Sequence, residues 1–183
     1  LEAIDVLFLC SGHGKSTEFW SENRRPDNLK VIDLAQDFRD EHDGYVYGLP
    51  EINRERIKTT SLLANPGCFA TAIQLSLIPL AASELLKEDV NVTGITGSTG
   101  AGVKPGATTH FSWRNDNLSV YKPFNHQHLL EINRTVKELE PKWNGKIRFV
   151  PVRGDFPRGI FVMATTKVDK PLEEIAALYK AYY

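Results

Sequence analysis

Short apolar runs alternate with polar, glycine-containing turns along the first third of the chain. The runs IDVLFLC (4–10), LKVIDLA (29–35) and TTSLLAN (59–65) have the continuous hydrophobicity of buried parallel strands. A helix is predicted over STEFWSEN (16–23), and the acidic, turn-rich segment 37–58 separates the second run from the third. This rhythm indicates the edge of a doubly wound parallel sheet.

From Phe69 the hydrophobic spacing changes to steps of three and four residues, which predicts a helix that Pro79 kinks or interrupts. Later apolar runs predict four more strands and two more helices. The strands are VNVTGIT (90–96), NLSVYK (117–122), KIRFVPV (146–152) and GIFVMATTKV (159–168), and the helices are EINRTVKELE (131–140) and LEEIAALYKAYY (172–183). Because strands and helices no longer alternate, we predict a parallel α/β unit over residues 1–67 and an α+β domain over 68–183.

The composition excludes several classes of protein. The chain has 183 residues, 42% hydrophobic and 25% charged, and a net charge of -1 gives it no general attraction to nucleic acid or an anionic membrane. Its apolar runs are far shorter than the roughly 18 residues of a membrane span, and its first residues lack the pattern of a signal peptide. Cys10 and Cys68 are too few for a disulfide framework, and no metal-binding spacing occurs, so we expect a protein of the reducing cytoplasm.

Two glycine-containing stretches have a superficial likeness to nucleotide-binding loops. CSGHGKST (10–17) ends like a P-loop, but Leu9 stands where that motif needs its first glycine, so the loop is too short to surround a phosphate. GITGSTGAG (94–102) follows a strand, but Pro105 and Gly106 follow where a dinucleotide-binding helix would begin. We interpret the second stretch as a flexible loop that lets the backbone approach a ligand closely.

The stretch ANPGC suggests a reactive cysteine. Pro66 and Gly67 end a buried strand, and Cys68 falls at the first turn of the following helix, where free N–H groups and the helix dipole stabilise a thiolate. The segment YKPFNHQHLLEIN supplies His126 and His128, with Glu131 close behind, as partners for acyl chemistry. The simpler alternative is a small buried cysteine that fills a strand–helix junction.

These residues carry a resemblance to a known family. DVLFLCSGHG, VIDLAQDFRD, YGLPEI, ANPGCFATA, GSTGAG, HQHLLEI and the RGI of residues 158–160 occur in the order found in the N-acetyl-gamma-glutamyl-phosphate reductase family, which is related to aspartate-semialdehyde dehydrogenase. The resemblance implies a Rossmann-type sheet followed by an α+β catalytic and dimerisation domain like that of glyceraldehyde-3-phosphate and aspartate-semialdehyde dehydrogenases. It also implies NADPH-dependent reduction of an N-acyl-gamma-glutamyl phosphate to the semialdehyde in arginine biosynthesis.

The family's functional residues map onto positions of this sequence. The resemblance implies Cys68 as the nucleophile that forms a thioester, His126 as general acid/base and Glu131 as the carboxylate that orients it. The remaining positions are proposed to bind ligands: Gly100, Ala101, Gly102, His13 and Gly14 for the cofactor, and Arg39 and Arg158 for a phosphate or carboxylate of the substrate.

The chain also departs from the family pattern. The glycine-rich GxxGxxG turn near the start and the Asn and Lys-Gly segment near the end are absent, which indicates an internal fragment whose hydride transfer on its own is doubtful. Gln127 and Leu130 replace the Arg and Pro common in the family. We expect a homo-oligomer, a dimer or tetramer, and two alternatives stay open: a Cys-His acyl hydrolase or acyltransferase, and a non-catalytic oligomerisation domain.

Overall fold

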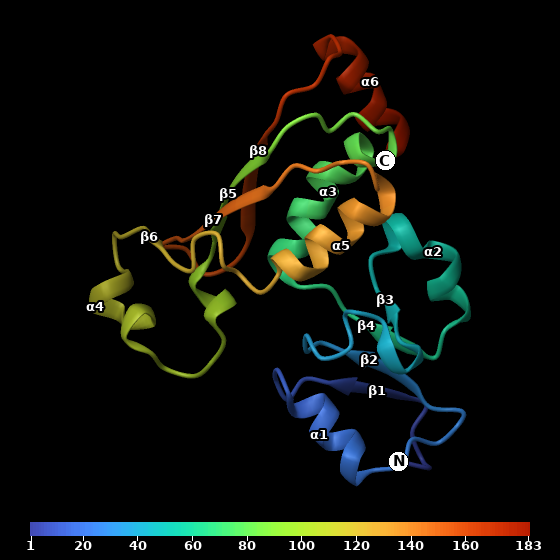
Figure 1. Ribbon diagram of the computed structural model, residues 1–183. Helices are drawn as coiled ribbons and strands as arrows, with labels where there is room; N and C mark the ends of the chain where they lie inside the picture. The colour runs from blue at the N-terminus through green and yellow to red at the C-terminus, as the bar shows by residue number, and fades with distance from the viewer. The chain divides into compact units, whose positions relative to one another are not determined.

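The computed structural model describes residues 1–183, which form two compact units, Leu1–Gly67 and Cys68–Tyr183. Each unit has its own four-stranded sheet and its own hydrophobic core. The chain path is shown in Figure 1. None of the helices combines the length and the hydropathy needed to cross a bilayer.

The sheet of the first unit is entirely parallel, in the order β1-β2-β4-β3. Its strands are β1 (Val6–Leu9), β2 (Lys30–Asp33), β3 (Val46–Tyr47) and β4 (Leu62–Ala64), and its helices are α1 (Lys15–Glu22), α2 (Pro50–Thr59) and the 3-10 turn η1 (His42–Gly44). Val31 of β2 pairs with Leu62 of β4, and both belong to the core of the unit with Phe38 and Tyr45. The three predicted strands and the first predicted helix are therefore confirmed.

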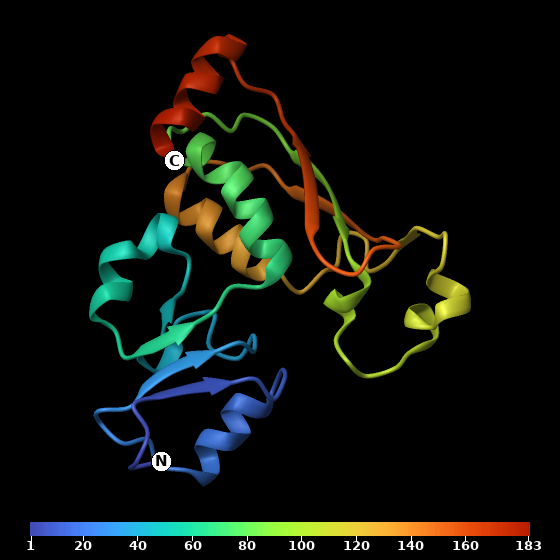
Figure 2. The same ribbon diagram turned by 180° about the vertical axis from the view of Figure 1, so that it is seen from behind.

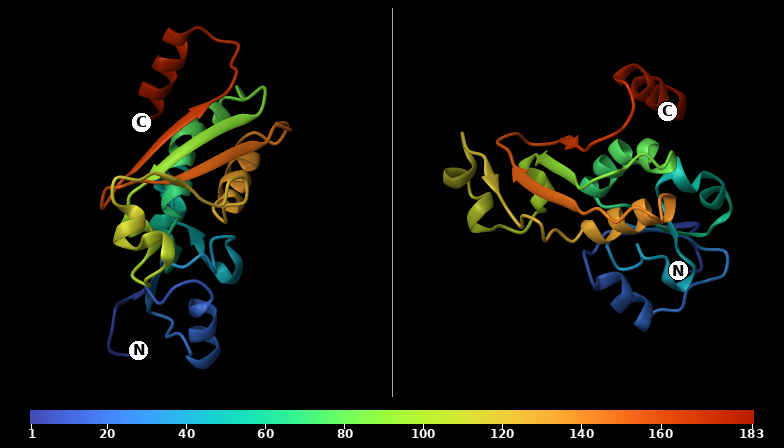
Figure 3. Two further views of the ribbon diagram at one scale, coloured as in Figure 1. Left: turned by 90° about the vertical axis from the view of Figure 1, so that its left-hand side faces the viewer. Right: turned by 45° about the horizontal axis from the view of Figure 1, so that its top comes forward.

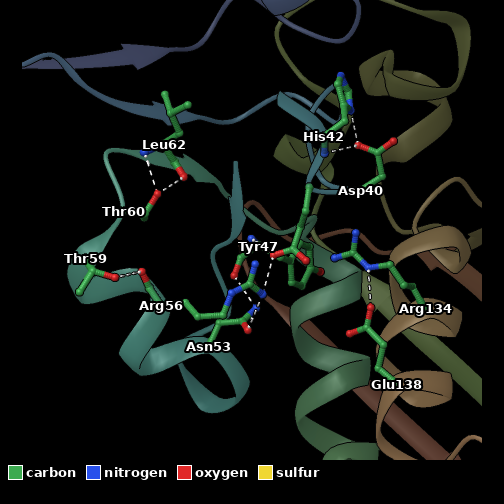
Figure 4. Close-up of polar contacts among 11 residues, drawn as sticks. Asp40, His42, Tyr47, Asn53, Arg56, Thr59, Thr60, Leu62, Arg134 and Glu138 are labelled. Carbon is green, nitrogen blue, oxygen red and sulfur yellow. Dashed lines mark hydrogen bonds and ion pairs between the residues drawn. The ribbon is translucent and has the colours of Figure 1, made fainter. Parts of the chain in front are cut away.

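The segment 37–58 contains more structure than its sequence predicts, since η1, β3 and α2 all lie in it. β3 has two residues, too few for a hydrophobic period, and α2 buries none of its residues, so no apolar stripe marks it. Polar contacts hold this segment together: Asn53 Nδ2 donates to the carbonyl of Tyr47 at 2.9 Å, and Arg56 Nη1 donates to Asn53 Oδ1 at 3.2 Å (Figure 4). Such contacts, between β3 and α2 and within α2, leave no periodic signal in the sequence.

The sheet of the second unit is mixed, in the order β6-β7-β5-β8, with β5 and β7 parallel and the outer pairs antiparallel (Figure 3). The strands are β5 (Val90–Thr96), β6 (Ser119–Val120), β7 (Ile147–Arg153) and β8 (Ile160–Thr165). The helices are α3 (Cys68–Ala82), α4 (Phe111–Arg114), α5 (Leu129–Leu139) and α6 (Leu172–Tyr182), with 3-10 turns η2 (Ser98–Ala101) and η3 (Ala107–Thr109). A parallel unit followed by an α+β unit confirms the predicted fold class.

Helices α3 and α5 lie side by side on one face of this sheet (Figures 1 and 2). Their apolar residues Phe69, Ile73 and Ile132 meet Phe149 of β7 in the core. The other face is not covered: Phe161 and Met163 of β8 are 62% and 55% exposed. The apolar spacing from Phe69 onward therefore marks the face of α3 that holds this helix against the sheet.

Helix α3 runs through Pro79 to Ala82, so the prediction that this proline interrupts the helix is wrong. Proline has no N–H, so Pro79 leaves the carbonyl of Leu75 without its helical donor. The hydroxyl of Tyr183 donates to that oxygen at 2.6 Å, and the hydroxyl of Tyr179 on α6 donates to the neighbouring carbonyl of Ser76 at 2.5 Å. Tyr183 thus supplies the donor that Pro79 lacks, and Tyr179 adds a bond to the next carbonyl.

Candidate active site

Cys68 is the first residue of α3 and its thiol is exposed. The apolar face of α3 is held in the core by Phe69, Ile73 and Leu77, so the helix is fixed while its N-terminal residue faces solvent. The N-terminus of a helix carries partial positive charge and unpaired N–H groups. Cys68 is therefore accessible at this end of the helix, and the alternative of a buried packing cysteine is wrong.

His126 lies in the connection between β6 and α5 and is only 5% exposed. Its ring makes edge-on contacts with four others: Phe69 at 5.6 Å, Phe149 at 5.5 Å, Tyr121 at 5.9 Å and His128 at 4.5 Å between ring centroids. This burial, with a smaller contribution from the charge of Lys122, lowers the pKa of His126 to about 4. The imidazole is therefore neutral at pH 7.

One hydrogen bond selects the tautomer of this neutral ring. The backbone N–H of His128 donates to Nδ1 of His126 at 3.2 Å. A nitrogen that accepts a hydrogen bond carries no proton, so in the neutral ring the proton is on Nε2. His126 consequently presents an N–H donor through Nε2.

The contact between Phe69 and His126 brings the histidine to the N-terminal end of α3, because Phe69 directly follows Cys68. Gly94 of β5 makes room for this packing, since a Cβ at Gly94 would lie 2.6 Å from the Phe69 ring. Glycine is required at position 94 for a steric reason, because a side chain there would displace the Phe69 ring that contacts His126.

Tyr121 belongs to the same site, and sequence reasoning did not single it out. Burial raises the pKa of Tyr121, the charge of Arg153 lowers it, and the charge of Cys68 raises it further. The Cys68 sulfur and the Tyr121 hydroxyl are therefore close enough to interact electrostatically. The only sequence signal for Tyr121 was its position in YKPFNHQH, five residues before His126.

Glu131 is buried in the first turn of α5, where the sequence predicts it. Its role in orienting His126 stays a prediction.

Arg158 and the glycine loop are brought together: the backbone N–H groups of Gly97 and Thr99 donate to the carbonyls of Gly159 and Pro157 at 2.9 and 3.1 Å. A Cβ at Gly97 would lie 2.7 Å from the carbonyl oxygen of Pro157, so only glycine permits this approach.

The two glycines of the loop 100–102 differ in the space around them. Gly102 has a φ of +81°, and no atom lies within 4 Å of the position of a Cβ there. Gly100 faces inward instead, with Thr96 Oγ1 at 2.9 Å from its Cβ position. Gly102 therefore fits close contact between backbone and ligand, as the resemblance implies.

The predicted ligand residues of the first unit are partly engaged by the protein itself. The carboxylate of Asp37 accepts from the backbone N–H groups of Gly14, Ser16 and Thr17 at 2.7, 3.1 and 3.2 Å. Partial burial alone would raise the pKa of Asp37, but the hydrogen bonds from Gly14, Thr17 and Ser16 outweigh it and lower the pKa. Because Asp37 occupies the N-terminus of α1, that helix does not fit a pyrophosphate, and the P-loop reading is excluded on structural grounds.

The side chains of His13 and Arg39 also form hydrogen bonds within the chain. Nδ1 of His13 accepts from the backbone N–H of Gln36 at 3.1 Å, while the adjacent Gly12 and Gly14 have positive φ angles and open space at their Cβ positions. The contact of this turn with a cofactor stays a prediction. Arg39, by contrast, is buried and donates to the carbonyls of Asn65 and Leu34 at 2.8 and 3.1 Å, so its guanidinium helps to hold the loop that precedes Cys68.

Comparison with known proteins identifies the two halves of the chain. Residues 68–183 match the profile "Semialdehyde dehydrogenase, dimerisation domain", and residues 1–60 match "Semialdehyde dehydrogenase, NAD binding domain". Among solved structures, aspartate semialdehyde dehydrogenase II from Vibrio cholerae and aspartate semialdehyde dehydrogenase from Francisella tularensis have TM-scores of 0.72 and 0.71, each at 17% identity over 99% of this chain and over 63% and 64% of theirs. That likeness shows the fold.

Curated proteins give closer matches over the whole chain. The N-acetyl-gamma-glutamyl-phosphate reductases of Phocaeicola vulgatus and Bacteroides thetaiotaomicron are 55% and 54% identical to it over 100% of its length. The chain spans 58% of the length of each of these two relatives. The resemblance predicted from the sequence motifs is confirmed, and the chain belongs to the semialdehyde dehydrogenase family.

Proposed function

We propose that this chain carries the acyl-transfer centre of a nicotinamide-dependent reductase that converts N-acyl-gamma-glutamyl phosphate to the N-acyl-glutamate semialdehyde in arginine biosynthesis. The observation that carries the proposal is an exposed cysteine at a helix N-terminus, followed directly by Phe69, whose ring contacts the buried, neutral His126. The names of the relatives at 54–55% identity support the substrate. Two free thiols suit a reducing compartment such as the cytoplasm.

The first step uses groups of this chain alone. The Cys68 thiolate attacks the carbonyl carbon of the acyl phosphate, the bond from that carbon to the phosphate oxygen breaks, and phosphate leaves with the bonding electrons. The product is a thioester on Cys68. Its sulfur is a good leaving group, which makes the acyl carbon reducible where a free carboxylate would resist reduction.

His126 acts in this scheme as a hydrogen-bond donor. Negative charge develops on the carbonyl oxygen as the thiolate attacks, and an N–H donor in a buried site stabilises such charge strongly. The Nε2–H of His126 is that donor, because Nδ1 accepts from His128. A hydrolase of the Cys-His type instead needs a histidine that gains a proton near neutral pH, and the lowered pKa of His126 disfavours that alternative.

The cofactor is NADPH in our proposal, with His13 and Gly14 of the first unit, and Gly100, Ala101 and Gly102 of the second unit, as its proposed contacts. When bound, it supplies the hydride that reduces the thioester to the aldehyde. The open backbone at Gly14 and Gly102 supports these contacts. Arg39 and Arg158 are proposed to hold anionic groups of the substrate, with Arg158 exposed beside the glycine loop and Arg39 less available.

The second unit is proposed to associate with another copy through its uncovered sheet face. Thr93 and Ile95 of β5 pair with Met163 and Phe161 of β8, and residues paired across an antiparallel ladder share one face. Two exposed apolar side chains on a sheet that has helices only on its opposite side favour an interface between copies. The match to a dimerisation domain supports a dimer or tetramer.

The 183-residue chain can be tested directly with N-acetyl-gamma-glutamyl phosphate. We expect release of phosphate and an acyl adduct on Cys68 in the intact-mass spectrum, with loss of the adduct in Cys68→Ser and not in Cys10→Ser. Cofactor oxidation, followed by absorbance, then separates reductase from hydrolase. Repeated turnover of phosphate with no oxidation of NADPH would favour the hydrolase, and no adduct at all would favour the non-catalytic domain.

A further inference from the structure

Two arginines of the second unit have guanidinium nitrogens that nothing in the chain satisfies. Arg114, the last residue of α4, is only 5% exposed. Its Nη1 donates to Ser119 Oγ at 3.0 Å and to the carbonyl of Arg153 at 3.2 Å, while its Nε and Nη2 are buried without a partner. The Nη1 of Arg153 donates to Thr108 Oγ1 at 3.2 Å, and its Nε is also buried and unpartnered.

No carboxylate balances these two charges. The ion pairs of the chain include neither Arg114 nor Arg153. The carboxylate of Asp155 accepts the backbone N–H of Asp116 at 2.6 Å and forms no ion pair with either arginine. A buried guanidinium without an acceptor costs free energy, so such a group marks a place where an acceptor from outside the chain is expected.

The arginine pair is connected to the candidate nucleophile through Tyr121. Arg153 ends β7, and its Cζ lies 4.6 Å from the centroid of the Tyr121 ring. That ring lies 5.9 Å from the His126 ring, and the Tyr121 hydroxyl interacts electrostatically with Cys68. An anion held by the two guanidinium groups would therefore lie beside the reacting groups.

We propose that Arg114 and Arg153 form an oxyanion-binding site for the substrate of Cys68, with the unpartnered nitrogens as donors. The ligand chemistry is a phosphoryl group or a carboxylate, because the planar guanidinium matches both with paired N–H donors. The inference rests on the proposed function only in taking this anion to be part of the molecule that acylates Cys68. It assigns binding residues beyond Arg39 and Arg158.

The test measures protection of Cys68 in the 183-residue chain. The rate of its alkylation by iodoacetamide is followed against increasing inorganic phosphate, and separately against glutarate, together with the melting temperature. We expect at least one of the two anions to slow alkylation. Protection by phosphate assigns the site to the phosphoryl group, and protection by glutarate assigns it to a carboxylate.

Variants test whether the protection of Cys68 from alkylation depends on the two arginines. Arg114→Met and Arg153→Met should each weaken binding of the protecting anion at least tenfold. The control is Arg148→Met, which should leave that binding unchanged, because Arg148 lies on the same strand as Arg153 but is exposed and paired with Asp89. If Arg114→Met does not fold, the test uses Arg153→Met alone, because Arg153 is only half-buried. Protection that is absent, or that survives in folded variants of both arginines, overturns the proposal.

The same assays separate this proposal from the proposed function. If Cys68 takes no acyl group from the acyl phosphate but anions still raise the melting temperature in an Arg114-dependent manner, the binding site stands and the catalytic proposal fails. If Cys68 is acylated at the same rate in wild type and in both arginine variants, the catalytic proposal stands and the oxyanion site fails.

Discussion

The backbone N–H of His128 donates to Nδ1 of His126, two residues earlier, and this contact decides what the histidine can do. It leaves the proton of the neutral ring on Nε2, so the imidazole is a donor toward any group that reaches that nitrogen. Burial reinforces the effect by keeping the ring uncharged at pH 7. The loop before α5 thus sets which nitrogen of His126 carries the proton, and burial keeps the ring uncharged.

Stability should depend on pH through His126. Its folded pKa of about 4 lies below the usual value of about 6.5, so between those values the unfolded chain binds more protons than the folded one. The stability contributed by the neutral ring is present above about pH 6.5 and is lost as pH falls toward 4, by at most about 1.4 kcal/mol per pH unit. Denaturant unfolding across this range should show that slope.

The matched variant is His126→Asn, which keeps a polar side chain and does not titrate. Its free energy of unfolding should fall less than that of the wild type between pH 6.5 and 4, since other titrating groups are common to both proteins. Parallel curves for the two proteins would show that His126 is protonated equally in the folded and unfolded states.

Asp37→Asn should destabilise the first unit. The carboxylate accepts three backbone N–H groups at the start of α1, and losing the charge at such a cap costs about 1–2 kcal/mol. Because the folded pKa is lowered, this stabilisation is present at neutral pH and disappears as pH falls below about 4. Urea unfolding at pH 7 and pH 3 would measure the loss of stability and its disappearance at low pH. The control is Asp27→Asn, at an exposed position. An equal loss of stability in the two variants at pH 7 would contradict the role of Asp37 as a cap.

The hydrogen bond from Tyr183 to Leu75 should matter only because Pro79 lacks an N–H. Tyr183→Phe should cost about 0.5 kcal/mol, a low value because the tyrosine is 58% exposed. In a Pro79→Ala background the helix supplies its own donor to Leu75, so the same substitution should cost almost nothing. A double-mutant cycle of unfolding free energies measures the difference, and equal costs in both backgrounds would contradict the explanation.

Met163→Lys should convert an oligomer of this chain to monomers. Met163 is 55% exposed on the uncovered face of the second sheet, and a charge buried in an interface between copies is strongly unfavourable. Analytical ultracentrifugation gives the mass of the wild type and the variant. Leu172→Lys is the control, since this leucine is 77% exposed at the start of α6 and away from the strands. A wild type that sediments as a monomer would refute the proposed interface.

The sequence by itself determined the strands other than β3, the main helices other than α2 and the position of Cys68 at a helix start. Each of these depends on residues close together in the chain: continuous apolar runs, steps of three and four residues, and the Pro66-Gly67 break before the cysteine. Such local patterns also sufficed to group His126 with Glu131 and to recognise the family.

The tertiary structure alone decided the properties that come from contacts between distant segments. α2 buries no residue and β3 has two, so neither produces a pattern. The helix continues past Pro79, and Tyr183, about a hundred residues away, supplies the donor that the Leu75 carbonyl lacks. The neutrality of His126, the participation of Tyr121 and the unpartnered arginines also depend on burial, and burial is fixed only when segments far apart in the sequence pack together.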